Sequence, residues 1–136
     1  SIENVYKWGL FRYPLKQSWY NDRVILIGDA AHPTLPFLAQ GAAMAIEDSF
    51  VLASKIFEFS NSFVAFKEFR RERFPRVRRV VLASTKNAHI FHLSNIISRR
   101  VFQVSLRFLS KFFPHLLVKR FNWIYDHNVT NKHYSS

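Results

Sequence analysis

A short apolar run, Val24-Ile25-Leu26-Ile27, ends at Gly28-Asp29 and constrains the fold more than any other segment. An uninterrupted run of β-branched and aliphatic residues is typical of a strand buried on both faces, as in a parallel sheet. Ligands of open α/β sheets bind beyond the carboxyl ends of such strands. The run therefore predicts an α/β fold with a binding site at Gly28 and Asp29. The segment from Lys7 to Tyr13, which Pro14 ends, is a candidate second strand.

Four helices are predicted after this run. The first spans Gly41 to Phe57, because apolar and small residues recur at helical spacing with Glu47 and Asp48 on the opposite side. Those positions are Ala42, Ala45, Ile46, Ser49, Leu52, Ala53 and Ile56. Neighbouring carboxylates point in different directions from a helix, so we expect Glu47 and Asp48 to be solvated or to pair with another helix.

Asn61-Ser62 predicts the N-cap of a long second helix, which Pro75 should kink or divide. Ser94-Asn95 predicts the break before a third, amphipathic helix, and Pro114 the start of a last short helix through Tyr125. One side of the second helix is almost all arginine: Arg70, Arg71, Arg73, Arg76, Arg78 and Arg79. These arginines could form a solvated face, pair with acidic residues elsewhere in a longer protein, or bind phosphate, membrane or nucleic acid.

The net charge of +11 lies entirely in the second half of the 136-residue chain. Residues 1–66 carry 5 basic and 6 acidic side chains, and residues 67–136 carry 15 and 3. A hydrophobic share of 49% excludes a disordered basic tail, and the lack of Cys excludes disulfide scaffolds and Cys-ligated metal sites. Without a zinc framework, helix-turn-helix or RNP-type pattern, no nucleic-acid partner is expected. Membrane-surface contact by the basic helices stays open.

The loop from Gly28 to Ala43 combines residue types that suit a ligand. A carboxylate at Asp29 can accept hydrogen bonds from a sugar or polyol hydroxyl. The helix start at Gly41-Ala42-Ala43 offers free N–H groups and a partial positive charge, with no large side chain in the way. The pattern predicts a polyol at Asp29 and a delocalised anion at Gly41.

The segment GDAAHPTLPFLAQGAAMAIEDSFVLA, residues 28–53, resembles the FAD-contacting GD motif of flavin-dependent aromatic hydroxylases. These are class A flavoprotein monooxygenases, and the salicylate hydroxylase and 3-hydroxybenzoate 6-hydroxylase group is the most similar. Residues 8–14, 69–94 and 120–125 share the resemblance. It implies the C-terminal piece of an FAD/NAD(P)-binding (Rossmann-like) domain. Residues 1–58 would end the FAD-binding domain, with one or two strands, and residues 59–136 would form a basic helical extension.

The resemblance also implies roles for single residues. Asp29 would bind the ribitol hydroxyls of FAD, Pro36 would lie beside the isoalloxazine ring near the substrate, and Gln40 is a candidate flavin or substrate contact. The N–H groups of Gly41 and Ala42 would face the pyrimidine carbonyl of the flavin. The implied cofactor-binding set is Gly28, Asp29, Ala30, Pro36, Gly41, Ala42 and Ala43.

Histidine residues carry no predicted catalytic or metal role. His32 precedes a proline and is expected to make structural hydrogen bonds rather than to act as a base. His89 and His92 share one helix face, but no third ligand or HExxH pattern accompanies them, so no metal site is predicted.

The implied reaction is hydroxylation of a small aromatic substrate: NADH or NADPH reduces FAD, and oxygen forms the flavin hydroperoxide that attacks the ring. The three glycines, Gly9, Gly28 and Gly41, cannot supply the GxGxxG that holds the FAD pyrophosphate. With Ser1 as first residue, we therefore expect the C-terminal part of a longer enzyme, without its N-terminal FAD-binding segment.

Neither a signal peptide nor an apolar run long enough for a membrane span is visible, so the expected location is cytoplasmic. Homo-oligomerisation stays open. The alternative function is a non-enzymatic basic helical module that binds a membrane surface or a partner protein.

Overall fold

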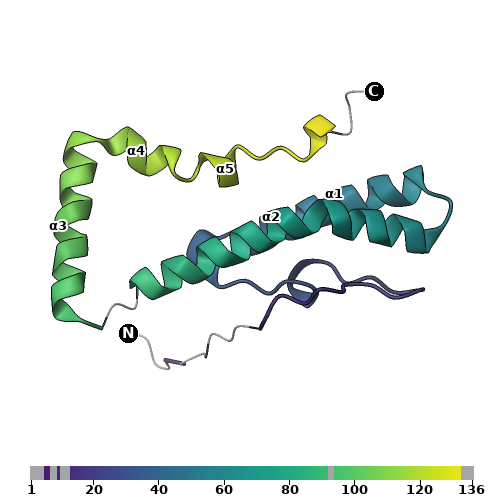
Figure 1. The fold of residues 1–136 in the computed structure, drawn as a ribbon, viewed down its shortest axis with the longest axis horizontal. Coiled ribbons are helices and arrows are strands. Elements are labelled where there is room, and N and C mark those ends of the chain that lie inside the picture. The colour runs from purple at the N-terminus through teal and green to yellow at the C-terminus, as the bar shows by residue number, and fades with distance from the viewer. Residues whose placement is uncertain (1–4, 7–8, 10–12, 92–93, 133–136) are drawn as a thin grey trace. The chain divides into compact units, whose positions relative to one another are not determined.

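The described part of the chain is mostly helical and contains five α-helices (Figure 1). The computed structural model describes residues 5–6, 9, 13–91 and 94–132. The helices are α1 (Gly41–Glu58), α2 (Ser62–Phe91), α3 (Ile96–Phe112), α4 (Pro114–Lys119) and α5 (Asn122–Tyr125). Single-turn 3₁₀ helices are η1 (Gly28–Ala30), η2 (Pro36–Leu38) and η3 (Thr130–Lys132).

The chain divides into two compact units, Ser1–Thr85 and Lys86–Ser136. The resemblance implies a different division, after residue 58, between the end of the FAD-binding domain and the helical extension. That division stays a prediction. In the described ranges, no helix combines the length and the apolar character needed to cross a bilayer.

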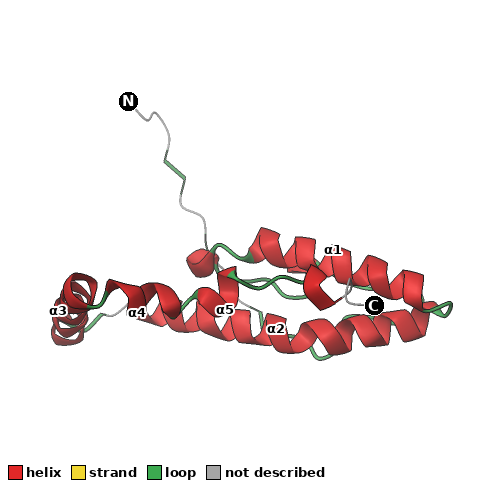
Figure 2. Cartoon of the chain, turned by 90° about the horizontal axis from the view of Figure 1, so that it is seen from above, coloured by secondary structure: helices red, strands yellow, loops and turns green. Residues whose placement is uncertain are grey.

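The predicted strand at residues 24–27 is not formed in the described part of the chain, where Figure 2 shows helix and loop only. The run makes one isolated antiparallel bridge, between Tyr20 and Ile25. Val24 is 56% and Leu26 37% exposed, so the run is not buried on both faces either. A strand buried inside a parallel sheet has hydrogen-bonding neighbours on both sides, whereas within the described ranges backbone hydrogen bonds join this run to residues 19–21 alone. The candidate second strand falls largely outside the described residues.

The segment before η1 folds back on itself and is anchored by Trp19. The Leu26 N–H donates to the Trp19 carbonyl (2.7 Å), and the Asn21 N–H donates to the Val24 carbonyl (2.9 Å). The Trp19 ring is fully buried, with its centroid 5.7 Å from that of Phe74 in α2. Its indole N–H donates to the Lys16 carbonyl (3.0 Å), so burial leaves no polar atom of the ring unpaired.

Helices α1 and α2 form the antiparallel pair that carries the core of the first unit (Figures 1 and 2). The predicted helix over 41–57 and the Asn61 cap are confirmed, with Asn61 Oδ1 accepting from the Val64 N–H (3.2 Å). Helix α2 continues through Pro75 as one element. The core side chains of this pair are Met44, Val51, Ala65, Phe66, Phe69, Val77 and Val80.

The face that α1 buries is the one predicted to be polar. Met44, Asp48 and Val51 are buried, whereas Ile46 is 71% exposed and Ile56 also lies exposed on the other side. The expectation that Asp48 lies opposite the packed face is therefore wrong. Its alternative, pairing with another helix, is confirmed, because charged partners come from α2.

In the second unit, the predicted break at Ser94-Asn95 precedes α3, and Asn95 caps this helix, with its Oδ1 accepting from the Ile97 N–H (2.9 Å). No residue of α3 is buried. The last predicted helix is two helices, α4 and α5. The Phe121 N–H donates to the Val118 carbonyl three residues back (2.8 Å), which tightens the chain and ends α4 before α5 begins.

Candidate functional site

The GD segment forms a tight turn against α1. Gly28 has φ +55°, a backbone conformation that L side chains rarely adopt, and a Cβ there would lie 3.2 Å from the Cβ of Ala45. The Gly28 carbonyl accepts from the N–H groups of Ala31 (3.0 Å) and His32 (2.9 Å). Glycine is therefore favoured at position 28 both by conformation and by the close approach to the helix.

Asp29 and Gly41, two residues of the predicted cofactor-binding set, lie close together. Asp29 is exposed, and a Cβ on Gly41 would lie 3.7 Å from its Oδ1 and 3.8 Å from Thr34 Oγ1. The first amide of α1 that donates within the helix belongs to Met44, to the Gln40 carbonyl (2.9 Å). The N–H groups of Gly41, Ala42 and Ala43 come before this bond, so they have no acceptor within α1.

A hollow of about 310 Å³ opens beside this turn. Its lining includes Asp29 and Ala30 from the predicted cofactor-binding set. The complete lining is Tyr13, Pro14, Lys16, Asp29, Ala30, Ala31 and Pro33. A polyol that bound Asp29 would have space here, with an amine and a phenol from the preceding segment nearby.

The loop between the turn and α1 is held by α2. Ser84 is buried and donates its hydroxyl to the Leu35 carbonyl (2.6 Å), just before η2. Pro36 opens η2 and is exposed, whereas Gln40 is buried immediately before α1. The two residues predicted near flavin and substrate thus both precede the start of α1. Pro36 is exposed to solvent, and Gln40 is buried.

Beneath the turn lies a buried ionic cluster that sequence reasoning missed. The Asp48 carboxylate accepts from the Gly28 N–H (2.9 Å), His32 Nε2 (2.6 Å) and Arg73 Nε (2.8 Å). Arg73 Nη1 also lies 2.7 Å from Glu47 Oε2. The side chains of His32, Asp48 and Arg73 are at most 2% exposed. The expected structural role of His32 is confirmed.

A sequence signal for this cluster does exist. Asp48 lies ten residues before the end of α1, and Arg73 lies eleven residues after the start of α2. Because residues 59–61 alone join the helices, an antiparallel hairpin places these positions opposite one another. None of the three interpretations of the arginines included pairing inside this chain. For Arg73 and Arg76 the partners are Asp48 and Glu47 of α1.

The cluster shifts the titration of both carboxyl groups. Burial alone would raise the pKa of Asp48, but hydrogen bonds from His32, Gly28 and Arg73 outweigh it and hold that pKa below its ordinary value. Burial likewise works to raise the pKa of Glu47, and the guanidinium groups of Arg76 and Arg73 lower it further than burial raises it. Both groups are therefore ionised at neutral pH.

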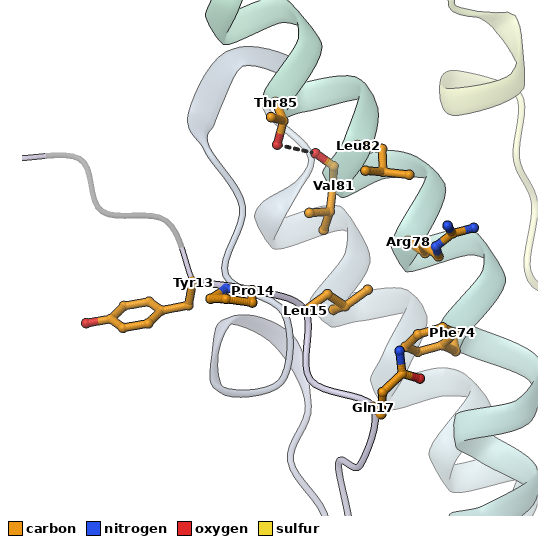
Figure 3. A pocket seen from close by; sticks show the side chains of 9 residues that line it. All are labelled: Tyr13, Pro14, Leu15, Gln17, Phe74, Arg78, Val81, Leu82 and Thr85. Atoms are coloured by element: carbon orange, nitrogen blue, oxygen red, sulfur yellow. Dashed lines mark hydrogen bonds between the residues drawn. The ribbon is translucent and has the colours of Figure 1, made fainter.

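A second cavity, of about 370 Å³, lies between the segment around Pro14 and helix α2 (Figure 3). Phe74, Val81 and Leu82 form its apolar wall on α2, with Arg78 beside them. It contains no residue of the predicted cofactor-binding set. Within the described ranges, no three His, Asp or Glu side chains gather as a metal site would require. His92 lies outside the described residues.

Comparison with known proteins identifies the class. The sequence model of a family described as "FAD binding domain" matches residues 1–84, and the chain belongs to this family. The matched residues contain the GD turn, α1 and most of α2, and they end next to the boundary between the two units. Membership supports an FAD/NAD(P)-binding fold, although the strands of that fold are not seen in the described part of this chain.

Particular relatives are aromatic-ring hydroxylases. A 3-hydroxybenzoate 6-hydroxylase of Polaromonas naphthalenivorans (strain CJ2) is 36% identical over 124 residues, covering 88% of this chain and 29% of the relative. The 3-amino-4-hydroxybenzoate 2-monooxygenase PtmB3 of Streptomyces platensis is 39% identical over 94 residues, covering 68% of the chain and 24% of the relative. The chain thus spans about a quarter of the length of these relatives.

Proposed function

We propose that this chain forms part of the flavin site of an FAD-dependent monooxygenase that hydroxylates a small aromatic compound. The observation that carries the proposal is the exposed Asp29 carboxylate beside the open N-terminus of α1 at Gly41. The chain that carries Asp29 and Gly41 belongs to the FAD binding domain family. Relatives of this chain are named as hydroxybenzoate hydroxylases and aminohydroxybenzoate monooxygenases.

The residues at the site fit the chemistry of FAD. Its ribityl chain carries hydroxyl donors that suit the Asp29 carboxylate, and its pyrimidine ring carries carbonyl acceptors that suit the N–H groups of Gly41, Ala42 and Ala43. A side chain at Gly41 would occupy the space beside Asp29. Gly28 and Ala30 place no bulky side chain on the turn. Bound FAD supplies the oxygen-activating chemistry, and the protein supplies orientation and exclusion of water.

Two residues are placed to border the substrate. Pro36 projects from the loop that Ser84 fixes, and Gln40 adjoins Gly41. We assign them to the region where the aromatic ring meets the flavin. NADH or NADPH serves as the electron donor in this proposal.

Another part of the FAD-binding domain completes the site in this proposal. The chain lacks a GxGxxG for the pyrophosphate, so that function falls to sequence outside residues 1–136. The exposure of Val24, Leu26 and Ile46 around the turn supports a covering segment there, because apolar side chains of this size gain from burial. Apolar coverage on both sides would also give the 24–27 run the environment of a sheet strand.

The test uses the full gene product and the variant Asp29→Ala, with Asp22→Ala as the matched control. Asp22 is an exposed carboxylate in the turn before the same apolar run. We expect the parent protein to bind FAD and to oxidise NADH or NADPH when a hydroxybenzoate is added. Loss of a charged hydrogen-bond acceptor should weaken FAD binding about tenfold or more in Asp29→Ala, and Asp22→Ala should behave as the parent.

The measurements are flavin fluorescence titration and mass spectrometry of the aromatic product. An Asp29→Ala protein with unchanged flavin content and unchanged hydroxylation would contradict the assignment of Asp29. A full gene product that binds no flavin would contradict the function itself.

A further inference from the structure

We infer that Asp48 is the positioning residue of the GD turn: it binds both ends of the turn and thereby sets where Asp29 lies relative to the start of α1. Its Oδ2 accepts from the Gly28 N–H (2.9 Å), where the turn begins, and from His32 Nε2 (2.6 Å), where the turn ends. Asp29 lies between these two anchors and is exposed. The consequence for FAD rests on the proposed function, whereas the consequence for the turn does not.

The turn needs this outside acceptor. Its internal hydrogen bonds use only the Gly28 carbonyl, which the Ala31 and His32 amides share. The Gly28 N–H is buried against α1, and a buried backbone donor without an acceptor costs free energy comparable to a lost hydrogen bond. Asp48 is the acceptor that the structure supplies. Without it, the left-handed conformation at Gly28 would lose its main tether to the helix.

The register of α1 links this anchor to the proposed ligand end. Gly41, Ala45 and Asp48 are spaced by four and three residues, which places them along one face of a helix. Gly41 lies beside Asp29, Ala45 lies against Gly28, and Asp48 binds the turn from below. One rigid helix face therefore contacts the turn along its length, and the position of Asp48 determines how Asp29 meets Gly41.

Arg73 keeps the Asp48 carboxylate in this orientation. Its Nε binds Asp48 Oδ1 (2.8 Å), so Oδ2 stays turned toward Gly28 and His32. Its Nη1 lies 2.7 Å from Glu47 Oε2, so one guanidinium joins two successive carboxylates of α1. Because an ionised carboxylate only accepts hydrogen bonds, His32 carries a proton on Nε2. Among the described residues its Nδ1 has no hydrogen-bond partner.

The decisive experiment compares Asp48→Asn with Glu58→Gln in the full gene product. Both variants replace a carboxylate of α1 by its amide, but Glu58 is half exposed and its partner in the described part of the chain is Lys55 of the same helix. Hydrogen–deuterium exchange of the peptide covering residues 28–32 reports on the turn, and a peptide from α3 serves as the internal reference. FAD titration reports on the site.

For Asp48→Asn we expect turn exchange at least about tenfold faster, FAD binding weaker by about tenfold, and α3 unchanged. Glu58→Gln should match the parent in all three. The inference is overturned if Asp48→Asn folds and residues 28–32 exchange as slowly as in the parent. It is also overturned if these residues exchange faster but FAD binds with the affinity of the parent. If the parent itself binds no FAD, the proposed function fails, and the exchange result alone decides on Asp48.

A second pair of variants guards against misfolding of Asp48→Asn. His32→Gln can present an amide N–H near the place of Nε2, whereas His32→Asn is too short to do so. We expect His32→Gln to retain slow exchange at residues 28–32 and His32→Asn to lose it. Equal exchange at residues 28–32 in His32→Gln and His32→Asn would overturn the inference. It would mean that a hydrogen-bond donor within reach of Asp48 makes no difference to the turn.

Discussion

A Cβ atom on Gly28 would lie 3.2 Å from the Cβ of Ala45, and the backbone of Gly28 has φ +55°. The turn that carries Asp29 therefore approaches α1 as closely as a residue without a side chain allows. Both the contact and the conformation disfavour any residue with a side chain at position 28.

Gly28→Ala is accordingly expected to lower the free energy of unfolding by about 2 to 4 kcal/mol, since a left-handed alanine and a crowded contact each contribute. Gly41→Ala is the matched control, because a Cβ there meets its nearest atoms at 3.7 and 3.8 Å, which are ordinary contacts. It should change stability by no more than about 0.5 kcal/mol. Urea denaturation followed by circular dichroism measures both, and equal effects would contradict the argument.

Arg73→Met should destabilise the protein by about 3 to 5 kcal/mol, because it leaves the buried Asp48 carboxylate without its guanidinium partner. The control is Arg71→Met on the same helix, where the side chain is 77% exposed and pairs with Glu68. An exposed pair of this kind contributes at most about 1 kcal/mol. If Arg73→Met were as stable as Arg71→Met at pH 7, the cluster would not stabilise the fold.

Stability should also decrease in acid. The pKa values of Asp48 and Glu47 lie below their ordinary values in the folded chain, so the ionised forms favour the folded state. This contribution is complete above the unfolded pKa values of about 4 to 4.5 and is lost as the pH falls through the folded ones. Denaturation at a series of pH values from neutrality to about 3 should show this loss. A Glu47→Gln protein should show a smaller loss, and a free energy of unfolding that rises over this range would be inconsistent with the shifts.

The 136-residue chain by itself should bind FAD more weakly than about 1 μM, because the ribityl and pyrimidine contacts lack the pyrophosphate site that a GxGxxG provides. Fluorescence titration of the isolated chain measures this directly. Sub-micromolar binding would show that residues 1–136 hold the cofactor without help.

Helix positions could be predicted from the sequence because their signals are local. Asn61 and Asn95 each cap the helix that follows them, and the small residues at Gly41 mark the start of α1. The strand predicted at residues 24–27 is not formed within the described ranges, since a strand depends on neighbours that are distant in sequence and a local pattern does not report on them. Among the described residues, the run pairs with the short segment at Tyr20.

Asp29 and Gly41 could be named as candidate binding residues from the sequence because both belong to one motif. The buried face of α1 could not be predicted, because the helical spacing of apolar residues includes Ile46 and Ile56, and both are exposed. What decides the face is Arg73, which is 25 residues from Asp48 in sequence and makes a carboxylate acceptable in the interior. Charge complementarity between the helices, rather than hydrophobicity, indicates the correct side.

The sharing of one carboxylate among three segments also restricts how this protein can evolve. Gly28, His32 and Arg73 each depend on Asp48, so a substitution at one position changes what is acceptable at the others. Replacing the charged members together by apolar residues of matching volume is expected to cost less than removing any one of them. Diverging sequences should therefore exchange His32, Asp48 and Arg73 as a set, through intermediates that are less fit than either end point.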